Sequence, residues 1–186
     1  ALIDALRERG IDAAAVLRGL NALHGALDSF GMLKAALSVG ADVPFCLMNS
    51  TGRCRGIGEK ITVFPSGGPL HLLLVMGGAG VSTAALFRSL KMDKLLHPDT
   101  DSAEAALRTG DPSALAPHLK NALLPPAAEN VPQIQEILER LRKAGALGAS
   151  MTGSGACCFG LFPTEEEAVR AAPAFSDLPF SAVCRS

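Results

Sequence analysis

The sequence predicts an α+β fold of two domains, the second built on a four-stranded sheet with helices on one face. Its 186 residues are 48% hydrophobic and 19% charged, so the chain can bury a core. The segment Ser66-Gly67-Gly68-Pro69 is the clearest linker, because glycine and proline punctuate regular structure. After it, the order is strand, helices, strand, hairpin strand, helix, strand. We therefore expect domains at residues 1–66 and 67–186.

In the first domain, apolar residues at helical spacing predict three helices, over residues 1–9, 13–23 and 30–39. Pro44 then forbids simple continuation of a helix. Residues 45–63 combine short apolar groups with three glycines, which predicts strands joined by tight turns.

In the second domain, caps and apolar runs define the expected elements. Pro132 suits the first position of a helix, and Thr164 can cap another whose first turn holds three glutamates. The expected strands are 71–76, 146–151, 156–162 and 180–184. The expected helices are 83–90, two short ones within 102–122, 132–143 and one that follows Thr164.

Charge and cysteine content exclude several classes of function. Lys plus Arg is 17 and Asp plus Glu is 18, so no overall field favours nucleic acid or an anionic membrane. No apolar run approaches the ~18 residues that span a bilayer. The five cysteines are odd in number and lack C-x-x-C spacing, which argues against a disulfide framework or a zinc site. An intracellular, cytoplasmic location is expected.

Three segments could carry chemistry, and each has a plainer alternative. In Met151-Thr152-Gly153-Ser154-Gly155-Ala156, two glycines around a hydroxyl residue could cradle a phosphate, or could form an ordinary hairpin turn. Asp42, held between small residues and Pro44, could be an oriented base or a turn residue. Residues 77–83 could form a phosphate loop, but a strand-to-helix turn capped by Ser82 or Thr83 is favoured.

Taken together and in order, these segments resemble the GHMP kinase superfamily. The similarity is narrowest to the branch that phosphorylates the cytidine-linked compound 4-diphosphocytidyl-2-C-methyl-D-erythritol. Gly40-Ala41-Asp42-Val43-Pro44 and Gly56-Ile57-Gly58-Glu59 are specific to that branch, whereas Gly153-Ser154-Gly155 marks only the superfamily. The other residues that carry the resemblance are 13–21, Gly80-Val81-Ser82-Thr83 and Phe87.

The resemblance implies a kinase that uses ATP and Mg²⁺ and acts on a small molecule, not on nucleic acid or a membrane, as a monomer or weak homodimer. It implies an ATP-binding and catalytic domain at 1–66 and a ferredoxin-like, substrate-binding domain at 67–186. Asp42 would be the base that accepts the proton of the substrate hydroxyl. Gly153, Ser154 and Gly155 would lie beside the phosphates, and Thr83 and Phe87 near the cytidine end. The metal ligands are not implied.

The resemblance also implies segments that this sequence does not contain. Family members have opening strands and a glycine- and serine-rich phosphate loop before the helix that corresponds to 13–23. The N-terminal domain is therefore expected to be incomplete here. The loop is either missing from the sequence between about Ile11 and Ala13 or genuinely deleted. Two further alternatives stay open: a kinase for homoserine, mevalonate or a sugar, and an inactive fragment that serves as a binding module.

Overall fold

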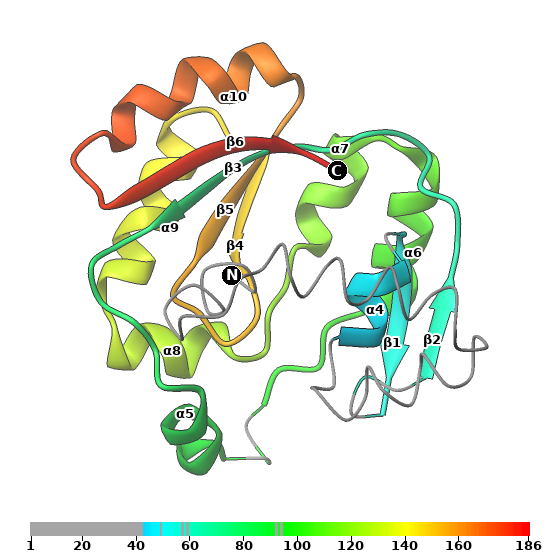
Figure 1. Cartoon of the computed structure of the whole chain (residues 1–186), viewed down its shortest axis with the longest axis horizontal. Coiled ribbons are helices and arrows are strands. Elements are labelled where there is room, and N and C mark those ends of the chain that lie inside the picture. Colours follow the sequence, from blue (N-terminus) through cyan, green and yellow to red (C-terminus); the bar gives the residue numbers. More distant parts are fainter. Residues whose placement is uncertain (1–42, 49, 57, 59, 92, 94) are drawn as a thin grey trace, which may run out of the picture. The chain divides into compact units, whose positions relative to one another are not determined.

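The computed structural model describes residues 43–48, 50–56, 58, 60–91, 93 and 95–186 (Figure 1). The chain divides into two compact units, Ala1–Pro65 and Ser66–Ser186. The helices expected at 1–9, 13–23 and 30–39 lie outside the described residues.

The described part of the first unit is a short helix followed by a hairpin. Helix α4 (Val43–Met48) precedes the antiparallel strands β1 (Gly52–Arg55) and β2 (Lys60–Val63), with Arg55 opposite Lys60. The prediction of strands was wrong for residues 45–48, which are helical. Pro44 is the second residue of α4, a position where a helix needs no amide hydrogen, so the proline starts this helix instead of preventing it.

The second unit is built on a four-stranded antiparallel sheet, as the sequence predicts. Its strands are β3 (His71–Met76), β4 (Gly148–Met151), β5 (Cys158–Phe162) and β6 (Phe180–Arg185). Their spatial order is β4-β5-β3-β6, with each neighbouring pair antiparallel. The first strand of the unit thus lies between the last two, and the α+β class is confirmed.

Helices of the second unit begin at the capping residues that the sequence offers. Asp99 accepts a hydrogen bond from the Ser102 amide, and Thr164 accepts one from the Glu167 amide. Helix α8 was not anticipated, because Pro125 and Pro126 in its first turn suggested a break. The helices are α5 (Thr83–Ser89), α6 (Thr100–Thr109), α7 (Pro112–Leu115), α8 (Leu124–Asn130), α9 (Gln133–Lys143) and α10 (Glu165–Ala171), with 3₁₀ turns η2 (Ala116–His118) and η3 (Ala172–Phe175).

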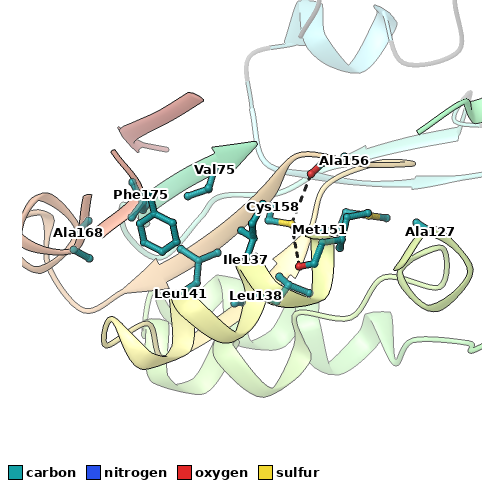
Figure 2. Packing of buried hydrophobic residues seen from close by; sticks show 14 of the residues in the cluster. Val75, Ala127, Ile137, Leu138, Leu141, Met151, Ala156, Cys158, Ala168 and Phe175 are labelled. Carbon is teal, nitrogen blue, oxygen red and sulfur yellow. Dashed lines mark hydrogen bonds between the residues drawn. The ribbon is translucent and has the colours of Figure 1, made fainter. Parts of the chain in front are cut away.

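The main core lies between the sheet and helices α9 and α10 (Figure 2). Four apolar side chains of α9 are at most 1% exposed, and each stabilises the fold by roughly 1.5–3 kcal/mol. They are Ile134, Ile137, Leu138 and Leu141.

Part of the opposite face is covered as well. Leu161 alternates with Phe162 along β5, so it points away from the main core, and it packs with Leu115 of α7 and Ala106 of α6. Helices α9 and α10 fit the predicted single helical layer, and α6 and α7 add a second, partial one. No helix among the described residues has the length and apolarity needed to cross a membrane.

Candidate functional site

The glycine-rich segment forms the turn that joins β4 to β5, which we call the β4–β5 turn (residues 152–157). Two backbone hydrogen bonds close it: the Thr152 amide donates to the Cys157 carbonyl at 2.9 Å, and the Gly155 amide donates to the Thr152 carbonyl at 3.1 Å. The amides of Gly153 and Ser154 have no acceptor among the described residues. The turn is therefore a hairpin connection that leaves two adjacent donors for a ligand.

Both glycines of the turn are required by its geometry. Gly153 has φ of 57° and Gly155 has φ of 94°, in the region that residues with a Cβ rarely adopt. At Gly155 space is also lacking, because a Cβ would lie 2.7 Å from Met151 Sδ and 3.2 Å from Val81 Cγ2. At Gly153 a Cβ would meet nothing within 4 Å, so only its φ demands glycine.

Ser154 of the turn is hydrogen-bonded to Thr83, the first residue of α5. The two hydroxyl oxygens are 2.7 Å apart, and either can be the donor. A hydroxyl has one hydrogen, so this bond uses one of the two hydrogens in the pair. The other remains to donate to a ligand oxygen. Two residues that the sequence analysis assigned to one site are thus in direct contact across 71 positions of chain.

Helix α5 is held in place by Leu86, which is 1% exposed and belongs to the main core. Its N-cap is Ser82, as the plainer interpretation of residues 77–83 predicted. Phe87 is 56% exposed and follows Thr83 by four residues, so both side chains lie on the same side of the helix. Thr83, Phe87 and Ser154 therefore belong to one continuous surface.

Sequence reasoning missed Asn121, which holds the β4–β5 turn in place. Its side-chain amide nitrogen donates to the Met151 carbonyl at 2.7 Å and to the Gly153 carbonyl at 2.9 Å. Its side-chain oxygen accepts from the Leu123 amide at 2.8 Å. The last bond is an Asx turn before a proline-led helix, which is the one local signal in the sequence that could have drawn attention to Asn121.

The thiols beside the turn are not nucleophiles at neutral pH. Burial raises the pKa of Cys158 to about 12, and it also raises the pKa of Cys157. Cys158 is fully buried, with Sγ 3.7 Å from the Ala156 carbonyl oxygen (Figure 2). The chemistry that the turn offers is therefore hydrogen-bond donation from two amides and one hydroxyl.

Other predicted residues are not brought to this site. Asp42 lies outside the described residues, as do Ile57 and Glu59 of the Gly-Ile-Gly-Glu motif. Within the part of the chain that the structure describes, no three His, Cys, Asp or Glu side chains are grouped so that they could hold a metal ion.

Comparison with known proteins agrees with the resemblance. Residues 103–178 match the family model for the GHMP kinases C-terminal domain. A 4-diphosphocytidyl-2-C-methyl-D-erythritol kinase of Caldicellulosiruptor saccharolyticus is 39% identical over 163 residues, 87% of this chain and 56% of that protein. The Rhizobium meliloti kinase of the same name is 42% identical over 166 residues, 89% and 54% of the two chains. The chain thus spans about half the length of these relatives.

Solved structures give the same answer for the fold. The chain is similar to a crystal structure of 4-(cytidine 5'-diphospho)-2C-methyl-D-erythritol kinase, with a TM-score of 0.76 and 30% identity over 93% of this chain and 62% of that one. A homoserine kinase from Cytophaga hutchinsonii, at 21% identity and a TM-score of 0.61 over 77% and 50% of the two chains, shares the fold. The chain belongs to the GHMP kinase family.

Proposed function

We propose that this protein is an ATP-dependent small-molecule kinase that phosphorylates the 2-hydroxyl of 4-diphosphocytidyl-2-C-methyl-D-erythritol. The observation that carries the proposal is the 2.7 Å hydrogen bond between Thr83 and Ser154. It joins the turn that we assign to phosphate binding to the helix that we assign to the cytidine end. The names of the relatives at 39% and 42% identity support this choice of substrate.

In this proposal, the β4–β5 turn binds phosphate oxygens. Phosphoryl transfer depends mainly on positioning and on stabilising the charge of the phosphoryl oxygens. The amides of Gly153 and Ser154 supply adjacent donors, and the Thr83–Ser154 pair supplies a hydroxyl hydrogen. Because Asn121 fixes the carbonyls on either side of Thr152, these donors are held in place before ligand binds.

Phe87 and Thr83 then contact the cytidine end of the substrate. An exposed aromatic ring offers a stacking surface for a base, and Phe87 is 56% exposed. The Thr83 hydroxyl lies one helical turn away on the same side of α5. In this arrangement Thr83 links the base-binding surface to the phosphate-binding turn.

Asp42 is the proposed base, and it directly precedes α4 in the sequence. ATP fits the donor set of the turn, and it brings the phosphoryl group that is transferred. Mg²⁺ enters the proposal as the usual partner of ATP, with no described side chains assigned to hold it. We assign ATP binding and catalysis to residues 1–66 and substrate binding to 67–186, in a cytoplasmic monomer or weak homodimer.

A substrate panel tests this function directly. ATP consumption by the full-length protein is measured with 4-diphosphocytidyl-2-C-methyl-D-erythritol, homoserine and mevalonate. We expect turnover with the first compound, at a kcat/KM at least 100-fold above the others, which is an ordinary level of enzyme discrimination. Preferred turnover of homoserine or mevalonate would contradict the proposed substrate. In the same assay, Asp42→Asn is expected to lower kcat by about 10²–10⁴-fold. A folded Asp42→Asn variant with wild-type turnover would remove Asp42 from the mechanism.

A further inference from the structure

A pocket of ≈ 560 Å³ lies on the sheet face opposite the main core, and we call it the α7 pocket. Its walls come from β3, β4 and β5 on one side and from α6, α7 and the segment 118–122 on the other. The volume is within the range of about 300–1,000 Å³ that small-molecule sites occupy. Most of the lining is apolar, including Leu72, Leu107, Leu119 and Phe159.

One polar group in this wall is unsatisfied. Ser150 is 2% exposed, lines the α7 pocket, and its hydroxyl has no hydrogen-bond partner among the described residues. Ser150 is paired with Phe159 across β4 and β5, so both side chains point to the pocket face of the sheet. A buried hydroxyl without a partner is costly, and a polar atom of a ligand would remove that cost.

The charge of the lining is positive. Lys120, which is exposed, and His118 both line the pocket, and none of the described residues that form its walls is acidic. His118 is close enough to Asp99 for their charges to interact, so Lys120 is the cation that a ligand would meet. An anionic head at Lys120 and an apolar body against the leucines would match this distribution.

We propose that the α7 pocket binds an amphipathic small-molecule anion, with its carboxylate or phosphate at Lys120, its apolar body against the leucines and a hydrogen-bonding group at Ser150. This site goes beyond the proposed kinase function. Asn121 and Gly153 line the pocket and also belong to the turn assigned to phosphate binding. A ligand here would therefore touch the side chain that holds that turn.

Methyl NMR of leucine-labelled, full-length protein tests binding in the absence of ATP and kinase substrate, so the result does not depend on the proposed kinase activity. Decanoate and decyl phosphate are the probes, and the tighter of the two identifies the preferred head group. We expect saturable shifts of the Leu72, Leu107 and Leu119 methyl groups. The cation decyltrimethylammonium should bind at least five-fold more weakly, since it meets Lys120 instead of an acid. Equal affinity for anion and cation, or shifts confined to other leucines, would overturn the proposal.

Variants separate the contributions to binding. Lys120→Gln should weaken decanoate about three-fold, whereas Lys143→Gln on α9, outside the pocket, should leave it unchanged. Ala103→Phe should fill the pocket and abolish the shifts in a protein whose other methyl signals are unchanged. If that variant does not fold, Lys120→Gln still decides, because identical affinity in the Lys120 and Lys143 variants would overturn the assignment of the head group.

The role of Ser150 is tested with 10-hydroxydecanoate, which carries a second polar group at the far end of its chain. We expect it to bind the wild-type protein about three-fold more tightly than decanoate, because one added hydrogen bond contributes modestly. In Ser150→Ala this preference should vanish while decanoate binds as before. A preference that survives Ser150→Ala would remove Ser150 from the site.

Discussion

Two segments of this protein have nearly the same composition and different structural demands. Residues 77–80 and the turn glycines Gly153 and Gly155 are both glycine-rich, and both adjoin hydroxyl residues. None of the glycines at 77–80 has positive φ, and a Cβ at Gly78 or Gly80 would meet nothing within 4 Å. Gly153 and Gly155 both have positive φ, and Gly155 also lacks space for a Cβ. Glycine content alone therefore does not identify a binding turn.

Contacts from distant parts of the sequence make the difference. Asn121 and Thr83 both hydrogen-bond to the β4–β5 turn, and Val81 packs beside Gly155. The segment 77–80 serves instead as the connection between β3 and α5. We infer that the turn is preorganised and that the segment 77–80 is not.

The largest expected effect comes from Gly155→Ala. The new Cβ would be placed at positive φ and 2.7 Å from Met151 Sδ, so backbone strain and overpacking add. We expect a loss of about 3 kcal/mol in the free energy of unfolding, measured by urea denaturation. A loss below 1 kcal/mol would show that the turn relaxes easily, and the contrast with residues 77–80 would fail.

Asn121→Ala is expected to be next in size. It removes the hydrogen bonds to the carbonyls of Met151 and Gly153 and the bond from the Leu123 amide. The expected loss of unfolding free energy is about 2 kcal/mol, because partly buried groups lose their partners. Asn130→Ala is the matched control, since its side chain makes one exposed bond to the Pro126 carbonyl and should cost at most about 1 kcal/mol. Equal losses would mean that Asn121 does not brace the turn.

Removal of the Ser154 hydroxyl should affect activity more than stability. Ser154→Ala is expected to lower kcat/KM about 10-fold, corresponding to ~1.4 kcal/mol of lost transition-state stabilisation. Thr83→Val should have a similar effect, and the double variant should be little worse than either alone, because both changes break one bond. Thr83→Ser keeps the hydroxyl and should stay near wild type. Fully additive losses would indicate that the two hydroxyls act separately.

The smallest expected effect belongs to the segment 77–80. Gly80→Ala introduces a Cβ that meets nothing within 4 Å at a residue without positive φ. The free energy of unfolding should change by less than about 0.5 kcal/mol, the range of an uncritical surface substitution. Thermal unfolding of this variant beside Gly155→Ala gives a direct contrast. A loss as large as that of Gly155→Ala would contradict the distinction between the two segments.

The sequence predicted those elements whose signals are local. The β3 run His71–Met76 and the Thr164 cap of α10 appear in the structure where they were expected, because apolar runs and caps act over a few residues. The proline-led helices α4 and α8 were missed for the opposite reason. Pro44, Pro125 and Pro126 suggested breaks, yet each lies in the first turn of a helix, where it is tolerated.

For the candidate site, the sequence supplied residue types but not contacts. Thr83, Ser154 and the turn glycines stood out through their motifs, and the structure brings Thr83 to Ser154. Asn121 could not be assigned a role, because its hydrogen bonds to the turn span 30 and 32 residues. The unsatisfied Ser150 hydroxyl and its pocket depend on how two layers pack against the sheet, which no local pattern encodes.

Amide NMR of the full-length protein with a non-hydrolysable ATP analogue tests the central claim most directly. The claim is that the β4–β5 turn, and not the segment 77–80, contacts phosphate. We predict large shifts for the amides of Gly153 and Ser154 on titration, since these donors have no acceptor among the described residues. The amides of Gly78 and Gly80 should stay in place. Shifts at Gly78 and Gly80 with none at Gly153 and Ser154 would contradict the account.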